Sequence, residues 1–354
     1  MKFGLFYQLP CAPDQSPATR YRETLEQIAL ADELGFDHAW LAELHFFQPF
    51  SIMPAPLQVA VAAAQRTRRI RLGTAVVLLP FHHPLRVAEE AASADLLTGG
   101  RLDLGVGRGT IAVHFGGFGV DRDESRERFE ESLAIIRGAW TSERFQYDGR
   151  FYRIRDIALA PRPLQQPHPP LWVAANSPDT AEFAGREGLD ILVASPINPL
   201  PKMFEHVARY RESRAQAGHD GSRGRVATAF FNCPAATLDQ ARALFEPSVM
   251  HYFHTIGDQA MLGDHGQYEG SYQYLRQVRE RALNIKWDEI NDTMGFFGPP
   301  EQCIERINHV YEGTRTSQIV SWFNPGGRIP HRDVMAAMER FAAKVLPAVR
   351  HLPE

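Results

Sequence analysis

The sequence has little cysteine, no long apolar run and no excess of positive charge. Its three cysteines among 354 residues, Cys11, Cys233 and Cys303, lie far apart and are odd in number. This pattern matches neither a disulfide framework nor a zinc site, and it favours reduced thiols in a cytosol. No apolar run approaches the ~20 residues that a membrane span requires. The amino-terminal "MKFGLFYQLP" is too short for a signal peptide and indicates a buried strand.

The charge balance excludes two further classes of partner. The formal net charge is -4 and the pI is about 6.4, without the basic footprint that is typical of nucleic-acid-binding proteins. No block of Lys and Arg flanks an apolar helix, as it would in a protein that binds a membrane surface. We therefore expect a soluble, cytoplasmic protein that binds neither nucleic acid nor a membrane.

Apolar segments of strand length alternate with amphipathic segments almost from end to end. Eight segments are predicted as strands: 2–8, 37–43, 70–79, 101–110, 171–177, 189–195, 225–234 and 318–323. Strands that alternate with helices indicate a parallel α/β fold, and eight is the number that closes a barrel. No shift in composition marks a linker, so we predict one domain over residues 1–354, a single (β/α)8 TIM barrel. A doubly wound sheet remains the alternative.

Two segments interrupt this alternation and are predicted as insertions. Within 144–170, Asp148-Gly149 separates two alternating, aromatic-rich segments, which predicts a β-hairpin. Residues 255–292 are polar and weakly patterned. They are too long for a plain connection, so they form either a mobile lid or an excursion with its own helices.

The stretch "RLDLGVGRGT" (101–110) has three glycines two apart, with Arg108 between the last two. A dinucleotide loop needs G-x-G-x-x-G at the start of a helix. Here the sixth position is Thr110, the following "IAVHFGGFGV" is not predicted to begin a helix, and the strand is the fourth of the series. We therefore reject a Rossmann loop. In a barrel this strand end would face the active site, where Arg108 could bind a phosphate. A packed bend with a solvated Arg108 explains the stretch equally well.

Polar residues follow other strands at the same end. Glu43 and His45 close the second strand, His82 and His83 the third, and "AANSPDTA" (174–181) the fifth. Each feature alone is usually structural, but their recurrence favours a ligand site at the carboxyl face of a barrel. A metal hydrolase is a minor alternative. No metal site is predicted, because the H-E-x-x-H spacing of zincins is missing. The G-x-S-x-G elbow of serine hydrolases is missing as well.

A series of longer segments adds to this pattern. In chain order they are "MKFGLF", "LADELGFDHAWLAELHF", "RLGTAVVLLPFHHPLRVAEE", "ADLLTGGRLDLGVGRG", "FGVDRDESRERFEE", "PLWVAANSPDTAEFAGREG" and "GPPEQCIERI". Together they resemble bacterial luciferase, its alpha subunit in particular, and the luciferase-like flavin-dependent monooxygenases. The resemblance covers nearly the whole chain.

The resemblance implies a TIM barrel with an insertion near the late strands and an enzyme that uses reduced FMN (FMNH2). It also implies O2 as co-substrate, a separate flavin reductase as partner, and a homodimer. In this family a flavin peroxide oxygenates a small organic substrate. One branch of the same superfamily uses a deazaflavin instead.

The resemblance further implies contacts to the cofactor. It places the flavin phosphate at Arg108 and Arg126 and on the backbone and hydroxyls of Asn176, Ser177 and Thr180. It also implies a non-proline cis peptide before Val76, so that Ala75 and Val76 lie against the isoalloxazine. Two guanidinium groups and a helix N-terminus suit a dianionic phosphate.

Two positions depart from the luciferase pattern. That pattern has two histidines after the glutamate of strand two, and the first acts as general acid or base, whereas this chain has Leu44-His45. The reactive luciferase cysteine corresponds to Gly107, which is expected to leave more space beside the flavin. An imidazole suits proton transfer at neutral pH. The candidate catalytic residues are therefore Glu43, His45 and His83.

We predict an FMNH2-dependent, two-component monooxygenase that acts on a small organic molecule. Two alternatives stay open: a deazaflavin-dependent oxidoreductase of the same fold that transfers hydride, and a non-catalytic flavin-binding partner subunit. The cofactor-binding residues argue against the partner subunit, whereas Leu44 favours it mildly.

Overall fold

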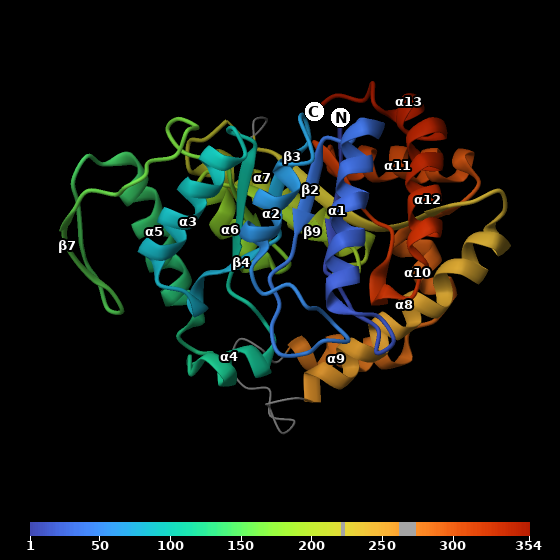
Figure 1. Cartoon of the computed structure of the whole chain (residues 1–354), viewed down its shortest axis with the longest axis horizontal. Coiled ribbons are helices and arrows are strands. Elements are labelled where there is room, and N and C mark those ends of the chain that lie inside the picture. The colour runs from blue at the N-terminus through green and yellow to red at the C-terminus, as the bar shows by residue number, and fades with distance from the viewer. Residues whose placement is uncertain (221–223, 262–273) are drawn as a thin grey trace.

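The computed structural model describes residues 1–220, 224–261 and 274–354, and these form a closed parallel barrel surrounded by helices (Figure 1). The barrel strands pair in the order β1-β2-β3-β5-β8-β9-β10-β12, and β12 pairs with β1 to close the ring. Their bounds are β1 (Lys2–Tyr7), β2 (His38–Leu41), β3 (Arg71–Thr74), β5 (Leu102–Gly107), β8 (Leu171–Ala174), β9 (Asp190–Ala194), β10 (Val226–Pro234) and β12 (Gln318–Trp322). All eight predicted strands are present, so the predicted TIM barrel is confirmed.

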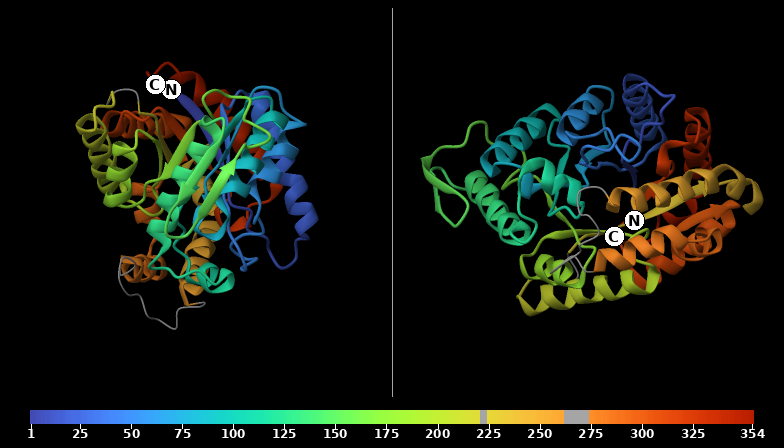
Figure 2. Two further views of the ribbon diagram at one scale, coloured as in Figure 1. Left: turned by 90° about the vertical axis from the view of Figure 1, so that its left-hand side faces the viewer. Right: turned by 90° about the horizontal axis from the view of Figure 1, so that it is seen from below.

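Helices connect the strands and cover the outside of the barrel, as the view from below shows (Figure 2, right). They are α1 (Pro17–Leu34), α2 (Pro56–Ala64), α3 (Pro84–Leu97), α4 (Ala112–Phe118), α5 (Ser125–Thr141), α6 (Pro178–Arg186), α7 (Leu200–Gln216), α8 (Leu238–Met261), α9 (Tyr274–Asn284), α10 (Trp287–Thr293), α11 (Pro300–Thr314), α12 (His331–Lys344) and α13 (Leu346–Val349). In the described residues the connections also contain the 3-10 turns η1 (Leu79–Phe81) and η3 (Pro325–Gly327). In the described residues no helix is long and apolar enough to cross a membrane.

Local sequence signals fix where several helices begin and end. The Ser16 hydroxyl accepts a hydrogen bond from the Thr19 amide (3.1 Å) at the start of α1, and Ser177 caps α6 in the same way. A proline occupies the first turn in both helices, where its missing N–H is not needed. Helix α1 ends at Gly35, whose φ of 87° is left-handed and favours glycine.

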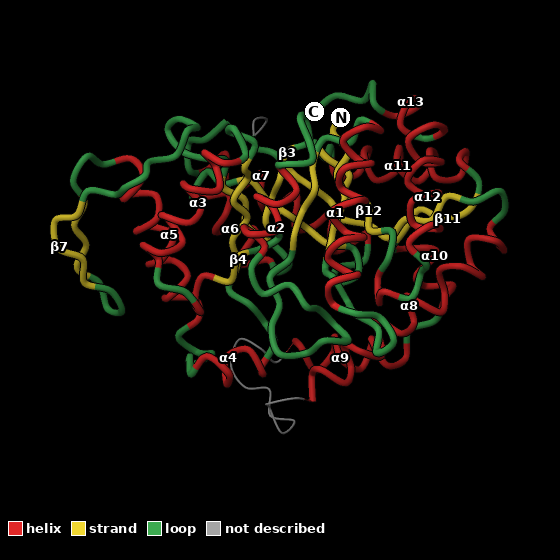
Figure 3. The backbone as a smooth tube through the Cα atoms, in the orientation of Figure 1, coloured by secondary structure: helices red, strands yellow, loops and turns green. Residues whose placement is uncertain are grey.

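The predicted hairpin is present. It consists of β6 (Phe145–Asp148) and β7 (Arg153–Ile157), which pair antiparallel and stand apart from the barrel at the left of Figures 1 and 3. The turn is longer than the two residues of a tight hairpin. Within it, the Gly149 amide donates a hydrogen bond to the Tyr152 carbonyl (3.0 Å). Glu131 of α5 accepts hydrogen bonds from the amides of Phe151 and Tyr152, which ties this turn to the barrel.

The predicted excursion at 255–292 lies partly outside the described residues, because 262–273 are not described. The remainder holds the end of α8, then α9 and α10, which supports an excursion with its own helices. A further strand, β11 (Gly295–Gly298), pairs with the carboxyl half of β10 and was not predicted.

Two sequence-based expectations about the strand ends were wrong. The third predicted strand, 70–79, is broken. After β3, the Ala75–Val76 peptide is cis, and β4 (Val77–Leu78) pairs with β5. The segment after Thr110 does begin a helix, the short α4. A Rossmann loop is still rejected, because Thr110 occupies the sixth position of the motif and because β5 is one strand of a closed barrel.

The amino-terminal end of the barrel interior is filled by a buried polar cluster. Asp103 accepts hydrogen bonds from Arg71 Nε (2.6 Å) and Trp172 Nε1 (3.1 Å), and His38 Nε2 lies 3.5 Å away. Burial alone would raise the pKa of Asp103, but His38 and Arg71 lower it to about 2. Trp40 packs edge-on against Trp172 (5.2 Å) above this cluster. The barrel is therefore closed at this end.

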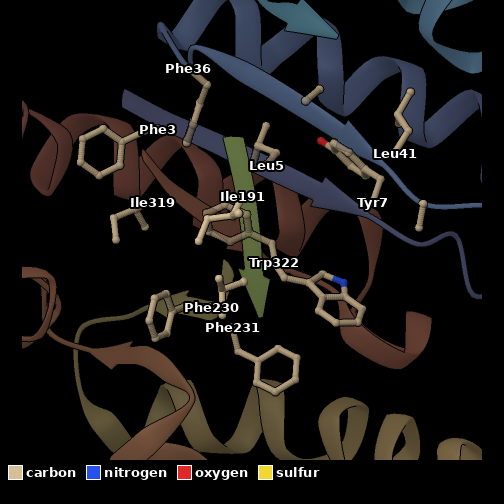
Figure 4. Packing of buried hydrophobic residues seen from close by; sticks show 14 of the residues in the cluster. Phe3, Leu5, Tyr7, Phe36, Leu41, Ile191, Phe230, Phe231, Ile319 and Trp322 are labelled. Carbon is tan, nitrogen blue, oxygen red and sulfur yellow. The ribbon is translucent and has the colours of Figure 1, made fainter. Parts of the chain in front are cut away.

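A second core lies between the strands and the helices (Figure 4). Phe3 of β1 and Phe36 both pack against Phe341 of α12, with ring centroids 6.0 Å apart in each pair. The three cysteines are also buried and unpaired, and burial raises the pKa of the Cys233 and Cys303 thiols to about 12.

Candidate active site

A cavity of about 350 Å³ opens at the carboxyl ends of the barrel strands, which point toward the lower side of Figure 1. Residues from strands all around the ring line it. Most of the lining is apolar, as in small-molecule sites. The predicted residues that line it are Glu43, Ala75, Val76, Gly107, Arg108, Asn176, Ser177 and Thr180.

One end of the cavity, which we call the anion end, consists of Arg108, Asn176, Ser177 and Thr180. Within the described residues Arg108 makes no hydrogen bond or ion pair. The Ser177 and Thr180 hydroxyls lie 2.9 Å apart at the start of α6, and Asn176 Oδ1 accepts from the Ala194 amide (3.1 Å). An unpaired guanidinium beside a helix N-terminus can bind an anion such as phosphate.

Arg126 lies outside the cavity. It is in the first turn of α5, and its guanidinium contacts Glu130 (3.0 Å) and Asp179 (3.8 Å). Asp179 precedes Thr180, so Arg126 borders the anion end from the outer side of α6.

The cis Ala75–Val76 peptide and Gly107 form a second part of the lining. A Cβ atom at Gly107 would lie 2.5 Å from Val76 Cγ2. The space at the position of the luciferase cysteine is thus filled by the Val76 side chain. The expectation that Gly107 leaves more room beside the flavin was wrong.

A buried carboxylate cluster lies between these parts. Glu43 Oε1 accepts hydrogen bonds from His45 Nε2 (2.9 Å) and His82 Nε2 (2.7 Å), and Oε2 accepts from the Leu78 amide (3.1 Å). Burial alone would raise the pKa of Glu43, but the two imidazoles outweigh it and lower the pKa. Burial would lower the pKa of His82, but Glu43 raises it. An ionised Glu43 and a protonated His82 therefore favour each other.

Leu44 and His45 point to different sides of the chain. Leu44 lines the cavity, whereas His45 packs beneath α4, edge-on against Phe118 (4.8 Å). The His45 amide donates to His114 Nε2 (3.2 Å). Burial and the nearby His45 lower the pKa of His114 to about 4, so His114 is neutral at pH 7.

His83 is exposed and does not line the cavity. Its Nδ1 accepts from the Leu85 amide (3.3 Å) and caps α3, and its ring meets Tyr152 edge-on (5.4 Å). Its neighbour His82 contacts Glu43 instead, although the sequence reasoning selected His83. The pair His82-His83 at the strand end did indicate a site residue. Which of the two rings contacts Glu43 depends on the 3-10 turn η1, which was not predicted from the sequence.

Sequence reasoning also missed the side of the cavity opposite the anion end. Gln8, at the end of β1, lines the cavity there, as do Tyr252 of α8, Arg279 of α9 and Trp322 of β12. Gln8 is the last residue of a predicted strand, 2–8, so the strand-end rule could have found it. Nothing in the pattern singles out Arg279. Among the described residues no group of three or more histidine, cysteine or acidic side chains could hold a metal ion.

These residues fit a flavin. The anion end suits its phosphate, and the apolar lining formed by Ala75, Val76 and Gly107 suits an aromatic ring. The buried Glu43 cluster lies beside that lining. A barrel with a cavity of this kind at its carboxyl mouth has the architecture of a TIM-barrel enzyme, whose active site lies at that face.

The family follows from comparison with known proteins. The family model described as luciferase-like monooxygenase matches residues 1–318, and the chain belongs to this family. The resemblance found in the sequence is thereby confirmed, and the enzyme is a flavin-dependent monooxygenase.

Named relatives match over almost their full length. The oxygenase component of the flavin-dependent trigonelline monooxygenase of Acinetobacter baylyi is 27% identical, over 98% of this chain and 95% of that protein. The alkanal monooxygenase alpha chain of Photorhabdus luminescens is 26% identical, over 99% of this chain and 97% of that protein. The crystal structure of monooxygenase RslO1 from Streptomyces bottropensis superposes with a TM-score of 0.80 at 29% identity, covering 98% of this chain and 99% of the other.

Proposed function

We propose that the protein is the oxygenase component of a two-component system that uses FMNH2 and O2 to oxygenate a small organic substrate. One observation carries this proposal: a single apolar cavity joins an unpaired arginine at a helix N-terminus to a buried carboxylate bonded to two imidazoles. The first feature suits a flavin phosphate, and the second suits proton movement beside the ring. Reduced FMN supplies two electrons, so that one atom of O2 enters the substrate and the other leaves as water.

The residues have separate roles in this proposal. The phosphate is held by Arg108, Ser177 and Thr180. Asn176 contacts it through the backbone, and Arg126 lies at the outer edge. Ala75, Val76 and Gly107 contact the ring. Glu43 is only 3% exposed where it borders the cavity, so its carboxylate is largely shielded from bulk water.

Glu43 and its imidazoles are proposed to exchange protons between the cavity and solvent. Glu43 lines the cavity, and the His82 side chain is 32% exposed, so the pair spans the wall. The lowered pKa of Glu43 and the raised pKa of His82 both favour the pair with the proton on His82. His45 holds Glu43 from the other side and orients it. His83 contacts neither Glu43 nor the cavity, and no role in proton transfer is assigned to it.

The partners and the setting belong to the same proposal. A separate flavin reductase is expected to supply FMNH2, because a relative is named as an oxygenase component. The three buried, unpaired thiols agree with a cytoplasmic location. A homodimer and a single domain over residues 1–354 remain predictions from the resemblance and the sequence.

The test does not require the substrate. FMNH2 bound anaerobically to the protein is mixed with oxygenated buffer, and flavin reoxidation is followed by absorbance in a stopped-flow instrument. Bound FMNH2 should reoxidise more slowly than free FMNH2, and Arg108→Ala should approach the free rate because it loses the phosphate contact. Arg86→Gln, which removes an exposed arginine paired with Glu90, is the matched control.

Two results would contradict the proposal. If bound and free FMNH2 reoxidise at the same rate, the cavity does not handle reduced flavin in the proposed way. If a reduced deazaflavin binds more tightly than FMNH2 and its hydride is transferred without O2, the deazaflavin alternative takes its place.

A further inference from the structure

The side of the cavity opposite the anion end has its own wall of aromatic residues. The anion end follows β5 and β8, whereas β1, β12 and β10 lie across the ring. Trp322 of β12 meets Phe6 and Tyr252 edge-on, each at 4.8 Å, and Tyr252 stacks on Phe50 at 5.8 Å. We call Phe6, Phe50, Tyr252 and Trp322 the aromatic wall. All four line the cavity.

Two polar side chains lie on the same side of the cavity. Gln8 is only 4% exposed, and its Oε1 is buried with no hydrogen-bond partner among the described residues. The Ser51 hydroxyl donates to the backbone carbonyl of Gln8, and Ser51 follows Phe50 of the aromatic wall. The backbone of Gln8 is therefore fixed beside that wall, and its side-chain Oε1 is an acceptor without a partner among the described residues.

Arg279 brings a positive charge to this side. It lines the cavity from α9, which packs against α8, the helix that carries Tyr252. Its Nε is buried with no hydrogen-bond partner, and no ion pair joins Arg279 to another described residue. Two residues further along the same helix, Arg281 contacts Glu289 at 2.6 Å. Among the described residues, Arg281 therefore has an acidic partner, whereas Arg279 on the same helix has none.

Within residues 1–220, 224–261 and 274–354, the cavity wall supplies no free counter-charge for Arg279. Among the described residues that line it, Glu43 is the one carboxylate, and its oxygens already accept three hydrogen bonds. Arg279 as a whole is partly buried, but its Nε is a buried donor without a partner, and a bound anion would satisfy it. Guanidinium and carboxylate groups form paired, charge-assisted hydrogen bonds.

We propose that Arg279 binds a carboxylate of the substrate, that Gln8 hydrogen-bonds a polar group of the same molecule, and that the aromatic wall packs against its apolar body. The substrate class is then an organic carboxylate with an apolar body of ring size or longer. The inference rests on the proposed function, because it assigns the anion end to the flavin phosphate and leaves the opposite side to the substrate.

Binding of matched acids and amides tests this inference. The probes are benzoate, cyclohexanecarboxylate and octanoate, each compared with its primary amide by calorimetry on the FMN-loaded protein. We expect at least one acid to bind roughly tenfold more tightly than its amide, as befits a charge-assisted contact. Arg279→Gln should remove this preference, Arg279→Lys should keep part of it, and the control Arg281→Gln should keep all of it. The FMN affinity should be the same in all four proteins.

Each other outcome overturns the inference. If no acid binds better than its amide, including the case in which nothing binds, the substrate is not of this class. If Arg279→Gln weakens FMN binding instead of acid binding, Arg279 belongs to the cofactor site. An Arg279-dependent preference for acids in a protein that fails the FMNH2 reoxidation test would overturn the proposed function alone.

Discussion

Replacement of Glu43 by glutamine tests the buried carboxylate cluster most directly. Glu43 accepts three hydrogen bonds, from His45, His82 and the Leu78 amide, and all three partners are donors toward it. A carboxamide has the same shape but offers one acceptor oxygen and an NH2 group. If the NH2 group replaces Oε2, it faces the Leu78 N–H, which is also a donor. If it replaces Oε1, both imidazoles must give up their Nε2 protons to accept from it, and the charge pairing with His82 is lost. Since a buried donor without a partner costs about 1–3 kcal/mol, Glu43→Gln should lower the free energy of unfolding by that amount.

The pH dependence of this effect has a defined sign. The pKa of Glu43 is lowered from 4.5 on folding, so its contribution is present above pH 4.5 and is lost as the pH falls through the folded value. The pKa of His82 is raised from 6.5, so its contribution is present below pH 6.5 and is lost as the pH rises through the folded value. The difference between the wild type and Glu43→Gln should therefore be largest between pH 4.5 and 6.5.

Urea unfolding at a series of pH values measures both quantities. Glu127→Gln serves as the control, since Glu127 pairs with Arg150 on the surface and its loss should change stability by less than about 0.5 kcal/mol. Equal urea midpoints for the wild type and Glu43→Gln across this range would refute the assignment of Glu43 as an ionised, triply bonded acceptor.

Three further changes have defined outcomes. Arg108→Ala should weaken FMN binding by about 2 kcal/mol in calorimetry, the size of a lost charge-assisted contact, and an unchanged affinity would refute the phosphate assignment. Asp103→Asn should lower the free energy of unfolding by about 3–5 kcal/mol at pH 7, because it leaves Arg71 without its buried partner. In the wild type the Asp103 contribution is present above pH 3.8 and is lost as the pH falls toward about 2, which acid unfolding would show. Gly107→Cys should destabilise the fold by about 1–3 kcal/mol because of its clash with Val76, and Val76→Ala in the same chain should restore most of the melting temperature, whereas no recovery would refute this packing.

The barrel could be predicted from the sequence because its strands are buried on both faces and so appear as short apolar runs. The break inside 70–79 could not, since "RLGTAVVLL" is apolar on both sides of the cis Ala75–Val76 peptide. Helix α4 was missed because its two adjacent glycines disfavour a helix locally. Close packing explains it: a Cβ at Gly117 would lie 2.3 Å from the Phe46 ring, so the glycine lets α4 approach that ring.

The site was predictable where it depends on strand ends and unpredictable where it depends on side-chain direction. Glu43 and Arg108 line the cavity because each lies at the carboxyl end of a barrel strand. The choice between His82 and His83 depends on a 3-10 turn that directs one ring inward and the other to the surface. Arg279 reaches the cavity from a segment without a clear pattern, so only tertiary structure could reveal it.

The burial of all three thiols has a practical consequence for bioconjugation. With a pKa of about 12, Cys233 and Cys303 are ionised in roughly one molecule in 10⁵ at pH 7, and burial also raises the pKa of Cys11. A maleimide dye should therefore leave the folded native chain unlabelled. A cysteine placed at the exposed Glu280, next to Arg279, would then take the dye alone and report by fluorescence when a ligand enters the cavity.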